Sequence, residues 1–259
     1  MERSMFTRLS RLYPVPVLLA LFTSSAVTTW AAEPLTLSPR TGLNAYAALV
    51  DQEFESASNG LRVLAVTENI QSGDWNRIKR PLGLFAKGMP TNAAVWFAQP
   101  DGSYFTVAAG QVHENLRDRD YFPRLMAGKE VMGDLVISKS TGKLSAIIAV
   151  PVQERGRVIG ALGVSAAMAK VAALLDEQIA FPQQIMFYAL DARGQIAMHR
   201  EPALLFNFAA ELGSPSLAEA VKEMLSQPEG TVHYEFEGAE REAIFKKSSV
   251  TGWVYALRW

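Results

Sequence analysis

The segment with the clearest chemical potential is Arg117-Asp118-Arg119-Asp120-Tyr121-Phe122, in which basic residues precede two aromatic residues. The guanidinium of Arg119 can donate paired hydrogen bonds to a carboxylate, and the rings of Tyr121 and Phe122 would lower the local dielectric constant. Judged on these residues alone, a simpler interpretation is favoured. In it, Arg119 pairs with a neighbouring aspartate on the surface, and the two aromatic side chains pack. The elements around the segment must decide between the two.

Catalytic and metal-binding patterns are weak elsewhere. Ser140-Thr141-Gly142-Lys143 matches the Ser-x-x-Lys pattern of acyl-enzyme chemistry, but that chemistry needs the serine at a helix start. Serine, threonine and glycine are expected anyway in the hairpin turn that we predict here. The three histidines are far apart and show no metal-ligand spacing: His113, His199 and His233. No Ser-His-Asp set can be assigned from residue order. We therefore expect no catalytic residue, no metal and no cofactor.

The elements flanking this segment read as β-strands. Strand candidates at 93–98 and 103–107 are joined through Asp101-Gly102, which is a strong hairpin signal. Three more strand candidates follow the segment, at 134–138, 144–152 and 158–164. Together they predict a five-stranded antiparallel sheet.

The part of the chain before this sheet is predicted to be helical. Apolar residues recur there at spacings of three or four, namely Leu43, Tyr46, Val50, Phe54, Ala57, Leu61 and Leu64. This stripe predicts one amphipathic helix over 39–70, which Asn59-Gly60 could bend. A second short helix is expected at 75–85, and a linking helix rich in Ala, Leu and Met begins at residue 166.

The order of elements then repeats. Strand candidates at 185–190 and 195–199 flank a turn, and a helix follows with Ser214 as its N-cap and Pro215 at its first position. Three strand candidates close the chain, at 230–236, 242–247 and 253–258. Two strands, a helical connection and three strands therefore occur twice, which favours a duplicated module over two unrelated α+β units.

This layout resembles the Cache domain, the PAS-like sensor module of bacterial receptors, and the repeat resembles its double-Cache form. The resemblance to one module covers about seventy residues and is most specific in the order of elements. It implies an α+β fold of two PAS-like modules, each a five-stranded antiparallel sheet, stacked along a long N-terminal helix. The implied segments are a signal peptide at 1–31, helices at 39–89, a membrane-distal module at 90–165, a linking helix at 166–181 and a second module at 182–259.

The resemblance also implies a ligand site in the membrane-distal module, where Arg119, Tyr121 and Phe122 would hold a ligand carboxylate. The amino-acid-binding members of the family carry an aspartate after the module's last strand, which binds the ligand's α-ammonium. Ser165 stands at that place here, and Glu114 stands where those members have a tyrosine. Because a neutral serine cannot offset an ammonium in a dry pocket, we expect a carboxylate or another small polar metabolite rather than an amino acid.

Three further residues are candidates for the same pocket. Trp96 and Tyr104 lie on the first predicted hairpin, where an aromatic side chain is about equally expected to line a pocket or to fill the core. Ser138 follows the segment on the next predicted strand and is a candidate hydrogen-bond donor.

The N-terminal residues read as a secretory signal. Three arginines precede a short apolar run that begins at Pro14, and Thr29-Trp30-Ala31 is a plausible cleavage site. The alternative is a retained anchor, but the run is shorter than a bilayer span. Removing residues 1–31 leaves 22 basic and 25 acidic residues, with no basic stripe, which argues against nucleic acid as a partner. With no cysteine, an exported chain has no disulfide framework.

These observations predict a non-enzymatic periplasmic sensor that binds a small molecule. Because no signalling module is recognisable in the sequence, we expect it to act through a partner, such as the periplasmic part of a membrane receptor or kinase. The sequence leaves the oligomeric state open. Two other functions stay open: an adaptor or structural protein with a vestigial pocket, and, with less support, a secreted serine hydrolase.

Overall fold

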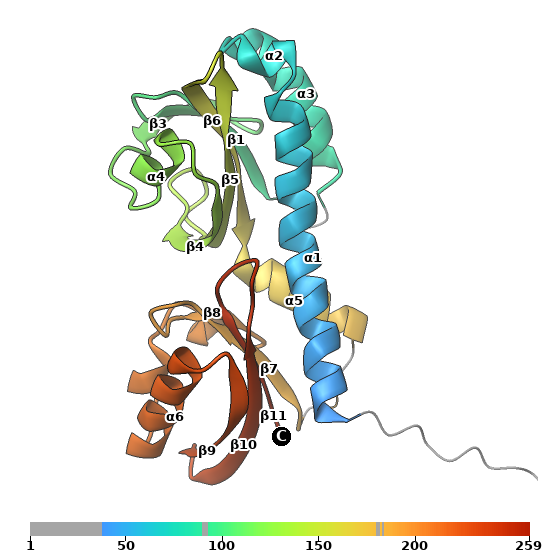
Figure 1. Ribbon diagram of the computed structural model, residues 1–259, viewed down its shortest axis with the longest axis vertical. Helices are drawn as coiled ribbons and strands as arrows, with labels where there is room; N and C mark the ends of the chain where they lie inside the picture. The colour runs from blue at the N-terminus through green and yellow to red at the C-terminus, as the bar shows by residue number, and fades with distance from the viewer. Residues whose placement is uncertain (1–37, 90–92, 180–181, 183) are drawn as a thin grey trace, which may run out of the picture. The chain divides into compact units, whose positions relative to one another are not determined.

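The computed structural model describes residues 38–89, 93–179, 182 and 184–259, and shows two antiparallel sheets with a long helix beside them (Figure 1). The expected signal peptide lies outside the described residues, as do position 90 and the end of the expected linking helix at 180 and 181. Within the described ranges, no helix is both long enough and apolar enough to cross a membrane.

The long helix is α1 (Pro39–Ala65). The hydroxyl of Ser38 caps it by accepting a hydrogen bond from the backbone N–H of Thr41 at 3.2 Å, and Pro39 fixes the backbone of the first turn. The predicted apolar stripe is buried from Leu43 to Leu61, and its last member, Leu64, is partly buried. The helix ends at Ala65, earlier than the predicted Ile70, because the backbone turns at Thr67 and the short helix α2 (Glu68–Gln71) begins there.

The predicted second helix is α3 (Trp75–Lys87), and the carboxylate of Asp74 caps it by accepting from Asn76 N at 2.9 Å. It packs closely against α1 at Gly60. A β-carbon at that position would lie 2.5 Å from a ring carbon of Phe85. Glycine is therefore needed for close approach, and α1 runs through Gly60 as one continuous helix.

The first sheet has the strand order β3-β2-β1-β6-β5-β4. Its strands are β1 (Ala94–Ala98), β2 (Ser103–Thr106), β3 (Gly110–Asn115), β4 (Val131–Ile137), β5 (Leu144–Glu154) and β6 (Arg157–Ala167). Five strands were predicted here, and the sixth, β3, is new. It is an edge strand with mostly exposed polar residues, so no alternation of apolar residues announces it. The short helix α4 (Phe122–Met126) lies between β3 and β4.

The second sheet has the predicted five strands, in the order β8-β7-β11-β10-β9. Its strands are β7 (Met186–Leu190), β8 (Ile196–His199), β9 (Glu229–Phe236), β10 (Ala239–Lys247) and β11 (Val254–Arg258). The linking helix is α5 (Met168–Ile179), and α6 (Pro215–Ser226) begins at its predicted cap, Ser214. Two short 3-10 helices, η1 (Pro202–Leu204) and η2 (Ala209–Glu211), lie between β8 and α6.

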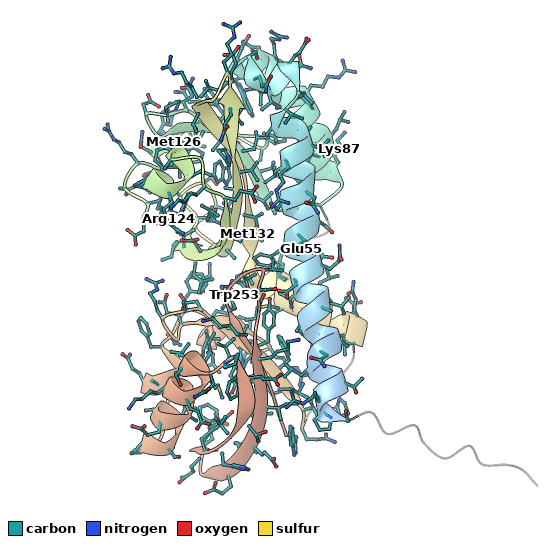
Figure 2. All side chains as sticks on the ribbon, in the orientation of Figure 1. Glu55, Lys87, Arg124, Met126, Met132 and Trp253 are labelled. Atoms are coloured by element: carbon teal, nitrogen blue, oxygen red, sulfur yellow. The ribbon has the colours of Figure 1, made fainter. Side chains whose placement is uncertain are left out.

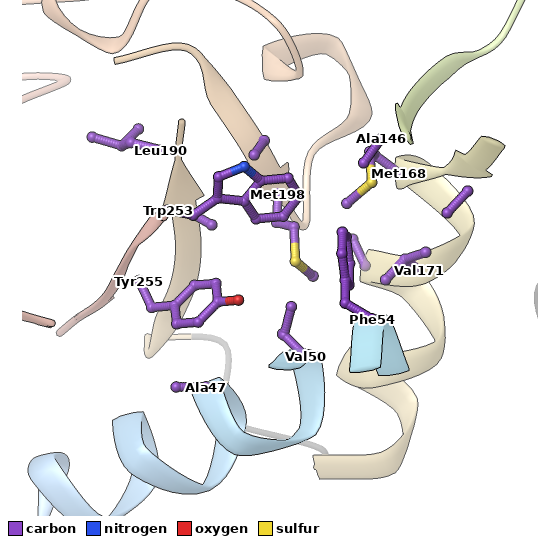
Figure 3. Close-up of a cluster of buried hydrophobic side chains, with 14 of the residues drawn as sticks. Ala47, Val50, Phe54, Ala146, Met168, Val171, Leu190, Met198, Trp253 and Tyr255 are labelled. Carbon is purple, nitrogen blue, oxygen red and sulfur yellow. The ribbon is translucent and has the colours of Figure 1, made fainter. Parts of the chain in front are cut away.

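A shared apolar core joins α1 to the second sheet and to α5 (Figure 3). Phe54 on α1 meets the ring of Trp253 edge to face, with 5.2 Å between ring centres. Nearby, the phenol of Tyr255 donates to the carboxylate of Asp51 on α1 at 2.6 Å, and the Ser248 hydroxyl donates to the same carboxylate at 2.7 Å. The buried face of α1 therefore packs against the second sheet through apolar contacts and through two hydrogen bonds to the carboxylate of Asp51.

Trp253 also contacts the first sheet. Its indole N–H donates to the carbonyl oxygen of Gly133 on β4 at 3.1 Å. Figure 2 shows Trp253 below Met132, the residue before Gly133. The strand pairing of β4 with β5 is irregular between Met132 and Asp134, and Gly133 has a φ of 88°. A β-carbon on Gly133 would come within 3.0 to 3.2 Å of the indole, so glycine permits both the bulge and the contact.

Candidate functional site

Six of the seven residues predicted for the ligand site line one small cavity in the first sheet: Trp96, Tyr104, Arg119, Tyr121, Ser138 and Ser165. They come from β1, β2, β6, the turn before α4 and the residue after β4. Phe122 is the exception. Its side chain is buried in the apolar cluster beside the cavity rather than on the lining.

Five residues that the sequence did not suggest complete the lining: Leu116, Val136, Lys139, Ser140 and Ile147. Lys139 and Ser140 belong to the β4–β5 connection, which the sequence identified only as a turn. Their residue types are ordinary for a turn, so no sequence signal distinguishes them from solvent-exposed residues. The hairpin places them over the cavity, and the Lys139 side chain is only 16% exposed.

Among the described residues, the side chain of Arg119 makes one hydrogen bond, from Nη2 to the carbonyl oxygen of Ile137 at 2.6 Å. Among the residues that the structure describes, no carboxylate pairs with it. The neighbouring Asp118 instead accepts from Lys139 Nζ at 2.6 Å, and this bond together with the lysine's charge lowers the pKa of the aspartate. The surface ion pair between Arg119 and an adjacent aspartate is therefore not formed, and its guanidinium keeps donors for another acceptor.

The phenol of Tyr104 is buried, and its oxygen has no hydrogen-bond partner within the described part of the chain. Burial raises the pKa of this phenol, and the nearby Ser140 hydroxyl, which lies outside strict hydrogen-bond geometry, opposes the increase. Leaving a buried hydroxyl without a partner costs roughly 1–3 kcal/mol. The phenol therefore offers the cavity a hydrogen-bonding group that no described protein atom uses.

Trp96 and Ser165 are bonded to each other on adjacent strands. The indole N–H of Trp96 donates to the hydroxyl of Ser165 at 3.1 Å, and both side chains are buried. The close approach depends on Gly163, where a β-carbon would lie 2.0 Å from the indole ring. Ser165 thus faces the cavity from β6.

The cavity is nearly closed. Its free volume is about 10 Å³, which is room for at most one water molecule. Arg119, Tyr121 and Val136 line this cavity and also line an open cleft of about 510 Å³ that extends to residues of the second sheet. These three side chains therefore form the wall between the cavity and the cleft.

A second pocket lies on the second sheet, beside α6, and His199 is on its lining. Burial lowers the pKa of this imidazole to about 4, and the nearby charge of Arg258 adds to the shift. The backbone N–H of Glu201 donates to Nδ1 at 2.9 Å, an arrangement that needs this nitrogen unprotonated. The folded protein thus keeps His199 neutral in a pH range where the unfolded chain binds a proton.

We expect stability to fall as pH decreases from 6.5 to 4, because the unfolded state takes up a proton that the folded state excludes. The contribution of this histidine to the free energy of unfolding should amount to about 3 kcal/mol across that window. Urea denaturation of the wild type and His199→Gln at a series of pH values measures it, and the variant should show the shallower slope. His113→Gln is the control, because His113 is exposed on β3. Equal slopes in wild type and His199→Gln would contradict the assignment.

Comparison with solved protein structures identifies known proteins with a similar fold. No family model matches the sequence, and a search of curated proteins gave no match. Solved structures do match. An extracellular ligand-binding receptor from Desulfohalobium retbaense aligns with a TM-score of 0.68 and 14% identity over 84% of this chain. The chain spans only 39% of that receptor's length.

In two other matches, the alignment covers most of this chain and most of the matched chain. The ligand-binding domain of the Pseudomonas aeruginosa amino acid chemoreceptor PctB, in complex with L-Arg, has a TM-score of 0.67 and 15% identity, covering 85% of this chain and 92% of that one. The sensor domain of the V. cholerae histidine kinase DctB has a TM-score of 0.62 and 12% identity, covering 85% and 94%. At these identities the likeness is one of fold, which confirms the predicted architecture. The chain has the double PAS-like, Cache-type fold of the sensory domains of chemoreceptors and histidine kinases.

Proposed function

We propose that this chain is a non-enzymatic sensor that binds a small carboxylate in the cavity of the first sheet. The observation that carries the proposal is the unsatisfied phenol of Tyr104 inside a polar cavity whose wall holds Arg119 without an acidic partner. The fold supports it, because the matched domains belong to extracellular receptors and kinases. We propose that the protein works outside the cytoplasm and acts through the extracytoplasmic part of a membrane receptor or kinase.

The charges of the lining favour an anion. Of the residues that the structure describes, no aspartate or glutamate lines the cavity, whereas Arg119 and Lys139 do. The charge of Lys139 is already met by Asp118, so Arg119 supplies the net positive charge. A guanidinium presents parallel donors that match the two oxygens of a carboxylate, and the hydroxyl groups of Tyr104 and Ser138 can donate to the remaining lone pairs.

The wall that Arg119 forms suggests how a ligand enters. The side chain is held by a single hydrogen bond to a backbone carbonyl. A carboxylate that arrives from the open cleft can replace that acceptor with a stronger, charge-assisted pair. Movement of Arg119 then joins the cavity to the cleft, which provides the volume that the closed cavity lacks.

One observation favours the alternative of an adaptor with a vestigial pocket, namely the free volume of about 10 Å³. A vestigial pocket is expected to fill with apolar side chains, however, because an unsatisfied hydroxyl has no compensating use there. The lining here keeps three serines and, among the described residues, one tyrosine phenol without a partner and one guanidinium without an acidic partner. The polar lining therefore favours ligand binding.

A thermal-shift screen of the purified protein tests the proposal. Small mono- and dicarboxylates are compared with the corresponding neutral amides, because a ligand that binds only the folded state raises the melting temperature by an amount that grows with the ratio of its free concentration to its Kd. We expect at least one carboxylate to raise it and its amide to leave it unchanged. A complete absence of stabilisation by any acid would instead support the adaptor.

Replacement of Ser165 tests the expectation about amino acids. Ser165→Asp places a carboxylate in the cavity, where it can accept from the Trp96 indole and offset a ligand ammonium. We expect the variant to gain weak affinity for free amino acids, of the order of millimolar, while the wild type shows none. Ser165→Asn is the matched neutral control. Calorimetric titration measures all three, and tight amino acid binding by the wild type would overturn this reading of Ser165.

A further inference from the structure

The second pocket, on the face of the second sheet that α6 covers, is a candidate for a separate ligand. Its lining is mainly apolar and includes Leu217 and Val221 of α6 and Leu204, Ala209 and Leu212 of the preceding turns. Its free volume is about 50 Å³, larger than that of the cavity in the first sheet. By the volume that one water needs, this space holds about three or four non-hydrogen atoms.

The strand register brings polar groups to one end of this pocket. Tyr188 on β7 is paired with His199 on β8 and with Ala256 on β11. Side chains two residues apart on a strand share a face, so Arg258 lies on the same face of the sheet as Tyr188 and His199. The phenol of Tyr234 completes the group and lies 3.3 Å from that of Tyr188.

Arg258 is the charged member of this group, and among the described residues no carboxylate pairs with it and no acceptor is bonded to its side chain. No aspartate or glutamate lines the pocket. Burial keeps the pKa of His199 low and those of the two tyrosines high, so these three groups are neutral near pH 7. A half-buried guanidinium therefore faces an apolar groove with neutral hydrogen-bonding groups around it.

A second arginine lies on the same face. Arg241 on β10 is paired with Tyr234, and Arg258 is paired with Ala243 on the same strand, so both arginines project from one side of the sheet. The Nε atom of Arg241 is buried without a hydrogen-bond partner. Arg241 is not on the pocket lining, but its register position beside Tyr234 adds a second positive charge to the sheet face that carries Arg258.

We propose that this pocket is a second ligand site, independent of the cavity in the first sheet, and that it binds a short-chain aliphatic monocarboxylate whose hydrocarbon tail, of about three or four carbons, occupies the free volume while its carboxylate lies at the Arg258 end. The carboxylate pairs with Arg258 and accepts from the tyrosine hydroxyls, and the hydrocarbon tail contacts Leu217 and Val221. A zwitterionic amino acid does not fit, because the lining offers no acid for its ammonium. A longer fatty acid exceeds the free volume.

Calorimetric titration with butyrate, and with butyramide as its neutral counterpart, tests this site. We expect butyrate to bind the wild type and Arg119→Ala alike, butyramide to bind at least about tenfold more weakly, and Arg258→Gln to lose about tenfold or more of the butyrate affinity. Arg193→Gln is the control, because Arg193 is an exposed arginine that pairs with Asp191 away from this pocket.

A second variant protects the test against misfolding of Arg258→Gln. Ala209→Leu keeps the arginine but fills the groove, and it should also lose butyrate. Equal binding of butyrate and butyramide, or binding that survives both Arg258→Gln and Ala209→Leu, overturns the site. Loss of butyrate binding in Arg119→Ala alone would place the ligand in the first sheet, contradicting this inference while supporting the proposed function. Absence of butyrate binding in the wild type also overturns it.

Discussion

Replacing Arg119 with alanine should abolish carboxylate binding and leave the fold nearly unchanged. The guanidinium is the charge on the cavity wall without an acidic partner, and removal of one member of a desolvated charge pair commonly costs about 2–5 kcal/mol of binding free energy. That range corresponds to a loss of affinity from about thirtyfold to several thousandfold. Titration calorimetry with a carboxylate that stabilises the wild type measures the loss.

The stability of Arg119→Ala should change little, because the side chain makes a single hydrogen bond, to the carbonyl of Ile137, and is partly exposed. Arg117→Ala is the matched control, since Arg117 lies two residues earlier and is exposed outside the cavity lining. Both variants should melt near the wild-type temperature, and only Arg119→Ala should lose the ligand. An unchanged affinity in a folded Arg119→Ala protein would show that the site lies elsewhere.

Replacing Trp253 with alanine should be among the most destabilising substitutions in the chain. The side chain is 2% exposed, packs edge to face on Phe54 and donates to the carbonyl of Gly133. Truncating a fully buried aromatic side chain costs about 3–5 kcal/mol through the lost contacts and the cavity left behind. We expect a correspondingly lower urea midpoint, because the substitution weakens the packing of α1, the second sheet and β4 at one point.

Two variants separate the parts of this effect. Trp253→Phe keeps a ring but removes the N–H, which leaves the Gly133 carbonyl without that donor, and should cost about 1–3 kcal/mol. Trp259→Ala is the control, because that tryptophan is 37% exposed, and its removal should change stability by about 0.5 kcal/mol or less. If Trp253→Ala lowered the free energy of unfolding as little as Trp259→Ala is expected to, the contacts of Trp253 would not be important for stability.

The sequence predicted the architecture because periodicity is a local property. The apolar stripe of α1, the Asp101-Gly102 turn and the cap at Ser214 each depend on neighbouring residues, and each is found where expected. The repeat of elements in the two halves led to the double-Cache resemblance, and the solved structures confirm that fold. The edge strand β3 was missed because its exposed polar residues carry no period-two apolar pattern.

The candidate site was only partly accessible from the sequence. The resemblance pointed to Arg119, Tyr121 and Ser165, the predicted hairpin added Tyr104, and the fold brings all four to one cavity. Judged on neighbouring residues alone, Asp118 would pair with Arg119, but it pairs with Lys139 instead. Lys139 lies 21 residues further along the chain, and residue order does not reveal such a contact. Packing also decides that no described residue makes a hydrogen bond with the Tyr104 hydroxyl, because its possible partners come from other strands and turns.

The sequence by itself thus determined the elements, their order and the chemical types available near the first sheet. Only the tertiary structure decided which of these groups meet. The cavity closes to about 10 Å³, Arg119 forms the wall toward an open cleft, and Arg258 reaches a second pocket without an acid beside it. The physical reason is that secondary structure follows from contacts between near neighbours, whereas burial, pairing and free volume are set by residues far apart in the chain.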